Sequence, residues 1–387
     1  MIEEIINGIN YRLDNDNLTA EVTEKSGGYE GAIIIPETVV LKKVAYRVTS
    51  IGEKAFDCCF SLTSIVIPDS VTSIGPTAFS SCSSLTSMVI PDSVTSIGEK
   101  AFEFCTSLTS IVIPDSVTSI GAWAFRYCTS LTSIVIPDSV TSIGEKAFDC
   151  CFSLTSIVIP NSITSIRKGA FESCRNLTSI TIPDSVTSIG EKAFEFCSSL
   201  ISIVIPDGVT SIGGRAFSGC SSLSSIVIPK SIKSISDDAF VGCSSFTSIV
   251  VVDGNTVYDS REKCNAIIET GTNTLIRGCQ ISIIPNGITS IGKNAFGICN
   301  TLISIIIPDG VTSIEAEAFR YCESLKSITI PASVENIGGL AFNGCKSLTK
   351  ITFQGTIAQW KKIELGDGWN NDIPAKVVHC TDGDVEI

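Results

Sequence analysis

The sequence contains one histidine, His379, near its carboxyl end. Nucleophilic catalysis by serine or cysteine requires a nearby base, usually histidine, that a third polar group holds in place. A single histidine in a terminal region makes such a triad improbable. Acid and base catalysis by carboxylates would require that one pKa be raised selectively, and the recurring aspartates sit in solvated turns where nothing would do so. We therefore expect no enzymatic activity.

Long apolar runs and an excess of basic residues are also missing. No segment approaches the roughly 18 consecutive apolar residues that predict a membrane-spanning helix. Lys and Arg number 27 against 40 Asp and Glu, a net charge of −13, which disfavours nucleic acids and anionic lipid surfaces as partners. The segment Met1–Gly8 lacks the basic and apolar regions of a secretory signal. These absences exclude a membrane span and a nucleic-acid partner.

What the sequence does contain is a repeat of 23 residues, typified by Leu131–Ser153. The leucine that opens each copy, replaced once by phenylalanine, recurs at Leu62, Leu85, Leu108, Leu131, Leu154, Leu177, Leu200, Leu223, Phe246, Leu302, Leu325 and Leu348. In the typical copy Ile134 and Ile136 alternate as in a short strand, which Pro137 ends. A second extended run carries Val140 and Ile143, and the segment that follows has room for one short helical turn.

One copy cannot fold alone. It offers about seven apolar side chains, each contributing roughly 1.5–3 kcal/mol when buried, against about 1–2 kcal/mol per residue of backbone entropy over the whole copy. Neighbouring copies must therefore cover each other. The sequence predicts a solenoid of about fourteen coils whose strands align into a parallel sheet.

The motifs Leu-x-x-Ile-x-Ile, Ile-Pro-Asp-Ser-Val-Thr-Ser-Ile-Gly and Ala-Phe-x-x-Cys, as in Ile113–Gly121 and Ala124–Cys128, resemble the BspA-type leucine-rich repeat family of bacterial surface proteins and some parasitic protists. The resemblance implies a curved, right-handed superhelix with a parallel sheet on one face, short helical turns or extended segments on the other, and caps at both ends. It also implies adhesion to host matrix proteins or aggregation between cells, at the cell surface or after secretion.

The repeat is interrupted at both ends and once inside, and these interruptions define the expected domains. Residues 1–31 form a hairpin cap, residues 32–353 the solenoid and residues 354–387 a second cap. A protruding hairpin is expected at Val39–Tyr46. At about 251–279 one coil carries ten extra residues with a hairpin, Asn265–Glu269 and Thr274–Arg277, and Cys279 takes the next leucine position. This coil is either a structural irregularity or a binding protrusion.

The carboxyl-terminal cap is expected to hold a short helix within Gly355–Ile363 and a last strand at Val377–Cys380. Trp360 and Trp369 have the bulk to close the last coil. They are interpreted as packing residues, with ligand-binding aromatics as the alternative.

Twelve of the seventeen cysteines share one repeat position: Cys59, Cys82, Cys105, Cys128, Cys151, Cys174, Cys197, Cys220, Cys243, Cys299, Cys322 and Cys345. Equivalent residues in a stack point the same way, as small apolar fillers would. We expect buried free thiols; disulfides between coils and metal sites are the alternatives. So many free thiols suit a reducing cytosol or an anaerobic habitat.

The turns repeat an aspartate at Asp69, Asp92, Asp115, Asp138, Asp184 and Asp207. Each turn offers one carboxylate, whereas Ca²⁺ takes six or more oxygen ligands. Solvated turn residues are expected, with a weak Ca²⁺ ladder as the alternative.

The outward positions of the first strand form columns of serine and β-branched residues. The candidate protein-binding face comprises Ser87, Val89, Ser110, Val112, Ser133, Val135, Ser156, Val158, Thr181, Val204 and Val227. Such columns stabilise a sheet by themselves, and a long uncharged stripe also suits an extended partner. The leading hypothesis is a non-enzymatic, protein-binding surface protein without cofactor or metal; the alternative is a cytoplasmic interaction scaffold or effector.

Overall fold

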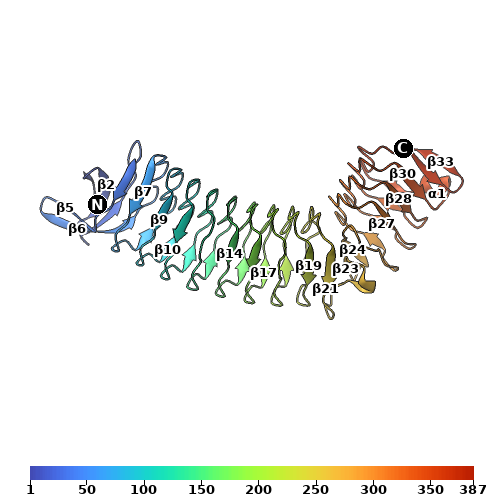
Figure 1. The fold of residues 1–387 in the computed structure, drawn as a ribbon, viewed down its shortest axis with the longest axis horizontal. Coiled ribbons are helices and arrows are strands. Elements are labelled where there is room, and N and C mark those ends of the chain that lie inside the picture. Colours follow the sequence, from blue (N-terminus) through green and yellow to red (C-terminus); the bar gives the residue numbers. More distant parts are fainter. The chain divides into compact units, whose positions relative to one another are not determined.

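A computed structural model describes all residues, Met1–Ile387. They fall into two units, Met1–Ser198 (unit 1) and Ser199–Ile387 (unit 2), and each is a solenoid of short parallel strands joined by turns (Figure 1). The helices are η1 (Arg261–Lys263), a 3₁₀ turn, and α1 (Ile357–Trp360). Neither is long or apolar enough to cross a membrane. The predicted repeat solenoid is confirmed, and the cap boundaries stay a prediction.

Each regular coil of unit 1 contributes one strand to a second ladder, and all but the coil Leu131–Ser153, which makes only a single bridge at Val135, contribute one to a first ladder. The first ladder contains β4 (Gly31–Ile34), β7 (Leu62–Val66), β9 (Ser87–Val89), β11 (Ser110–Val112), β14 (Ser156–Val158) and β16 (Ser179–Thr181). The second contains β6 (Val44–Ile51), β8 (Ser73–Ile74), β10 (Ser96–Ile97), β12 (Ser119–Ile120), β13 (Ser142–Ile143), β15 (Ser165–Ile166) and β17 (Ser188–Ile189). Equivalent residues pair in parallel, for example Ser87 with Ser110 and Ile97 with Ile120.

The third side of each coil is made of turns, and the predicted helical turn at Glu145–Phe148 is wrong. Lys146 (φ 53°) and Cys150 (φ 61°) adopt left-handed conformations. This geometry turns alternate N–H groups toward the next coil: Lys146 N–H donates to Lys168 O (2.9 Å) and Phe148 N–H to Ala170 O (2.9 Å). The result is a third ladder between coils. Propensity favours a helix, but the bonds between coils satisfy the backbone instead.

The core is a set of columns in which each repeat position stacks on its equivalent. The phenylalanines are buried and nearly parallel, with ring centroids 5.4 Å apart for Phe125 and Phe148 and 5.6 Å for Phe148 and Phe171. Gly144 shows how closely the coils approach, because a Cβ there would lie 2.3 Å from Ala122 N. Any larger residue would push the two coils apart.

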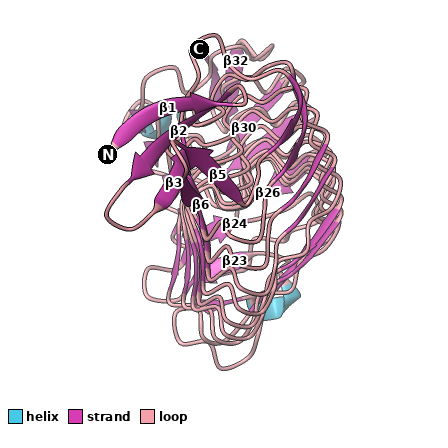
Figure 2. Ribbon diagram, turned by 90° about the vertical axis from the view of Figure 1, so that its left-hand side faces the viewer, coloured by secondary structure: helices cyan, strands magenta, loops and turns pink.

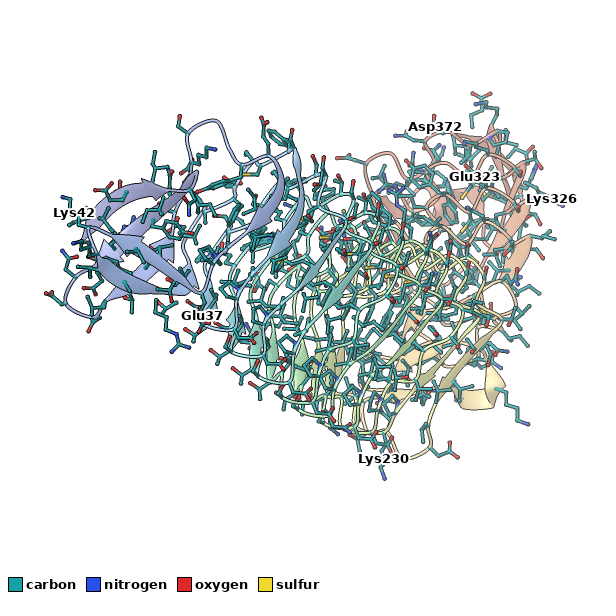
Figure 3. All side chains as sticks on the ribbon, turned by 60° about the vertical axis from the view of Figure 1, so that its left-hand side comes forward. Glu37, Lys42, Lys230, Glu323, Lys326 and Asp372 are labelled. Atoms are coloured by element: carbon teal, nitrogen blue, oxygen red, sulfur yellow. The ribbon has the colours of Figure 1, made fainter.

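An antiparallel meander closes the amino-terminal end of unit 1. It consists of β1 (Ile2–Ile6), β2 (Ile9–Asp14) and β3 (Thr19–Val22), and β3 joins β6 in parallel (Figure 2). The hairpin of β2 and β3 is confirmed, whereas β1 was not predicted. The second expected hairpin is also confirmed: β5 (Thr38–Leu41) pairs with β6, and Lys42 stands at its tip (Figure 3).

Unit 2 has the same construction. Its strands are β18 (Ser211–Ile212), β19 (Ser225–Ile228), β20 (Ser234–Ile235), β21 (Ser248–Val251), β22 (Tyr258–Asp259), β23 (Ile267–Glu269), β24 (Thr274–Arg277), β25 (Ser290–Ile291), β26 (Ser304–Ile306), β27 (Ser313–Ile314), β28 (Ser327–Ile330), β29 (Asn336–Ile337), β30 (Lys350–Phe353), β31 (Glu364–Leu365), β32 (Val377–Cys380) and β33 (Gly383–Glu386). The predicted hairpin of β23 and β24 is confirmed, and β24 joins the second ladder in parallel with β25.

The coil with this hairpin lacks the turns of the third side. Arg277, which is 2% exposed, takes over part of their role. Its Nη1 donates to Asn294 O and Gly297 O (both 3.2 Å), and Gly278 N–H donates to Ala295 O (2.9 Å). A side chain thus replaces a missing donor of the third ladder.

Cys279 does not take the leucine position that the spacing predicted. Ser282 N–H donates to Cys279 O (3.1 Å), the bond that Leu62 N–H makes to Cys59 O (3.1 Å) in a regular coil. Cys279 therefore stands where regular coils have their cysteine. Cys59 and Pro68 are nine residues apart, but only six separate Cys279 from Pro285, so the first-strand segment of this coil is three residues shorter.

The carboxyl-terminal cap contains the predicted helix and strand. A capping box between Thr356 and Gln359 begins α1. Trp360 and Trp369 are buried, with ring centroids 5.9 Å apart, so their packing role is confirmed. The strand β32 is not the last, because β33 follows and pairs with it antiparallel.

Candidate protein-binding face

The structure places all eleven candidate residues on the solvent side of the first strand, and we call these positions the strand face. In unit 1 the columns are continuous across neighbouring coils, as in the pairs Val89 with Val112, Val112 with Val135 and Val158 with Thr181. Val135 is 78% exposed, although its neighbour Ile134 is 6% exposed. In unit 2 Val204 and Val227 are exposed in the same way. Strand alternation therefore presents β-branched side chains to solvent in rows.

Hydroxyl groups on the strand face fall into two kinds. The threonine that follows the repeat leucine is tied to the preceding coil, as when Thr109 Oγ1 donates to Thr86 O (3.1 Å) and Thr132 Oγ1 to Thr109 O (3.3 Å). The next residue, for example Ser110 or Ser133, is exposed, and its hydroxyl makes no hydrogen bond within the protein. The serine column therefore supplies free donors and acceptors beside the valine column, and a partner could use both.

The strand face of the regular coils in unit 1 carries no charged side chain, since the acidic groups lie in the turns. Asp69, Asp92, Asp115, Asp138, Asp184 and Asp207 are all exposed, as predicted. Neither unit contains three or more His, Cys, Asp or Glu side chains placed to hold a metal ion.

The repeat cysteines are buried free thiols, as predicted. Most of them donate to the backbone oxygen of a phenylalanine in the preceding coil; Cys151 Sγ, for example, donates to Phe125 O at 3.2 Å. Burial raises the pKa of Cys59 to about 11 and that of Cys243 to about 12, which suppresses the reactive thiolate. Cys58 lies outside the repeat position and is exposed.

The third side of unit 1 carries a cluster of ion pairs that was not predicted from the sequence. Arg126 Nε lies 3.0 Å from an oxygen of Asp149, Arg126 Nη1 lies 3.2 Å from Glu103, and Lys146 approaches Asp149 (3.7 Å) and Glu172 (3.0 Å). The signal was present, because Glu103, Arg126 and Asp149 occupy one position in successive copies with alternating charge. These groups satisfy each other and hold the coils together.

The strand face of unit 2 carries exposed isoleucines that were not predicted from the sequence. Ile283 is 69% exposed, Ile303 58% and Ile306 78%. The repeat register could have identified Ile303 and Ile306, because they stand where other copies have exposed threonine and valine. The strand face of unit 2 therefore exposes isoleucine at positions where unit 1 exposes threonine and valine, although it also carries Lys326 and Lys350.

A concavity of about 950 Å³ lies at the amino-terminal cap. Glu3, Glu21 and Glu53 line it, and Arg12 pairs with Glu21 (2.8 Å). The histidine is elsewhere, with His379 Nδ1 2.8 Å from Asp384 in unit 2. The concavity is therefore lined mainly by charged side chains.

Comparison with known proteins agrees with this architecture. A leucine-rich repeat protein from Bacteroides ovatus is 30% identical over 93% of this chain and 97% of its own, with a TM-score of 0.69. A leucine-rich cell surface protein from Faecalibacterium prausnitzii is 29% identical over 94% of this chain and 98% of its own, with a TM-score of 0.52. No curated protein is significantly similar in sequence.

The family model described as a BspA type leucine rich repeat region matches residues 49–178, 164–265 and 276–364, in six copies. Leucine-rich repeat proteins are generally non-enzymatic and typically take part in protein interactions or act as surface proteins. The matched segments cover most of the repeats described above, and on these grounds the chain belongs to the BspA-type leucine-rich repeat family.

Proposed function

We propose that this protein is a non-enzymatic surface adhesin that binds a host or neighbouring-cell protein through its strand face. The observation that carries the proposal is the uncharged stripe of exposed valines flanked by serine hydroxyls without partners. Removing water from such a surface buries no charged group. Each free serine hydroxyl can exchange its hydrogen bond to water for one to a backbone group of the partner. An extended protein segment fits this pattern best.

A surface location is supported by the relative from Faecalibacterium prausnitzii, which is described as a cell surface protein. The many free thiols do not argue strongly against it. The repeat thiols are inaccessible, and burial raises their pKa, so an oxidising exterior would reach few of them.

The proposal can be tested with purified chain and a panel of immobilised extracellular-matrix proteins, with binding followed by biolayer interferometry. The variant V112K/V135K/V158K places three charges on the strand face. A matched control, T95K/T118K/T141K, adds the same charge at exposed positions directly before the second strands of three coils in unit 1. We expect the first variant to lose binding by at least tenfold and the control to retain it. Equal binding by both variants would move the site away from the strand face.

The second candidate is an intracellular interaction scaffold. It is favoured by the seventeen cysteines, none of which forms a disulfide. Fractionation of the source cells separates the two functions, because a chain found only in the cytosol would rule out adhesion.

A further inference from the structure

The coil that carries the β23–β24 hairpin leaves an open place on the strand face of unit 2. Its first-strand segment is three residues shorter than in a regular coil, as the spacing from Cys279 to Pro285 shows. Beside it lies a groove of about 510 Å³. The floor and walls of the groove come from Ser282–Asn286 on one side and from Ser304, Ile305, Ile306 and Pro308 on the other, with Glu262 at its edge.

The backbone next to this groove is incompletely paired. The strand β26 pairs with β28 on one side only. No backbone hydrogen bond joins residues 279–286 to residues 302–308, whereas in unit 1 Thr155 N–H still donates to Thr132 O (3.3 Å) where the strands are irregular. The edge of β26 therefore presents backbone groups that an additional extended chain could pair with.

The side chains around the groove define what such a chain must look like. Ile283 and Ile306, 69% and 78% exposed, form an apolar row on the solvent side. Ile305, 7% exposed, lies on the inner side. Glu262 is the one charged residue that lines the groove, and its carboxylate has no ion-pair partner. The guanidinium of neighbouring Arg261 forms its ion pair with Asp259, at 2.8 Å.

We propose that this groove binds an extended segment of the partner protein by adding a strand to β26. The segment carries apolar side chains at alternate positions, which pack on Ile283 and Ile306, and a lysine or arginine that pairs with Glu262. This inference rests on the proposed function, since it assigns one peptide-docking site on the strand face. The three missing residues set the length of the paired stretch at about three to four residues.

The test is selection of displayed random octapeptides on the intact immobilised chain. The selected sequences should share alternating apolar residues with a basic residue at one end. The affinity of the best peptide, measured by isothermal titration calorimetry, should fall at least tenfold in I283K/I306K. It should also fall in E262K and recover when the basic residue of the peptide is changed to glutamate. Methylation of the peptide's backbone nitrogens, one at a time, should weaken binding at every second position, because only alternate amides face β26.

The matched control is V112K/V135K in unit 1, which should bind the peptide as the unaltered chain does; circular dichroism confirms that each variant is folded. The inference is overturned if no peptide is enriched, if the enriched peptides are acidic, or if methylation has no alternating effect. If V112K/V135K no longer binds the peptide and I283K/I306K still does, the groove is not the peptide site and the proposed function stands. If I283K/I306K weakens peptide binding, but neither it nor V112K/V135K/V158K weakens binding to matrix proteins, the groove is a peptide site and the proposed function is wrong.

Discussion

Replacing Phe148 by alanine tests whether the stacked columns hold the solenoid together. Phe148 is fully buried and stacks on Phe125 and Phe171 at 5.4 and 5.6 Å. Truncating a buried phenylalanine costs about 3–5 kcal/mol, and two ring contacts of about 0.5–1.5 kcal/mol each are lost with it. Because both faces of the ring are covered, we expect about 4–5 kcal/mol less free energy of unfolding. F60A, at a phenylalanine that is 58% exposed, should cost under about 0.5 kcal/mol.

The assay combines urea denaturation, followed by circular dichroism, with hydrogen exchange read by mass spectrometry. In a stack that is stabilised between nearest neighbours, the damage should be local. The amides that bridge coils next to the substitution, such as Phe125 N–H to Ala147 O, should exchange faster. Phe319 N–H, bonded to Ala341 O in unit 2, should not change. A loss below about 1.5 kcal/mol, or faster exchange spread evenly over the chain, would refute the reasoning.

Three further results are expected. In the folded chain Ellman's reagent should modify Cys58 quickly and the repeat cysteines only after denaturation, because the latter are buried; rapid modification of more than three thiols would contradict the structure. The free energy of unfolding should fall as pH rises above about 9, because the unfolded chain ionises thiols whose folded pKa is raised, to about 12 for Cys243, at about 1.4 kcal/mol per unit of difference. A maximum above pH 10 would contradict this. R126M should lower the free energy of unfolding by about 2–3 kcal/mol in urea denaturation, since it leaves Glu103 and Asp149 without their shared partner. K168M, at an exposed ion pair, should lower it by less than about 1 kcal/mol. Equal losses would argue against the ion-pair cluster.

The period of the sequence determined most of the fold. A leucine every 23 residues, with Ile134 and Ile136 in alternation and Pro137 as a stop, defines one strand and its inward face, because strand geometry places alternate side chains on opposite sides. The outward valines follow from the same rule. The burial of the cysteines followed from their shared position in the stack.

What only the tertiary structure decided is how neighbouring coils bond to each other. The third side contains turns with left-handed Lys146 because its N–H groups find acceptors in the next coil, and no local preference predicts that. The hydroxyls of Thr109 and Ser110 look alike in the sequence, yet one is tied to another coil and the other is free. The register of Cys279 was likewise settled by a backbone bond. Periodicity describes one coil, whereas these features depend on the distance and direction between two.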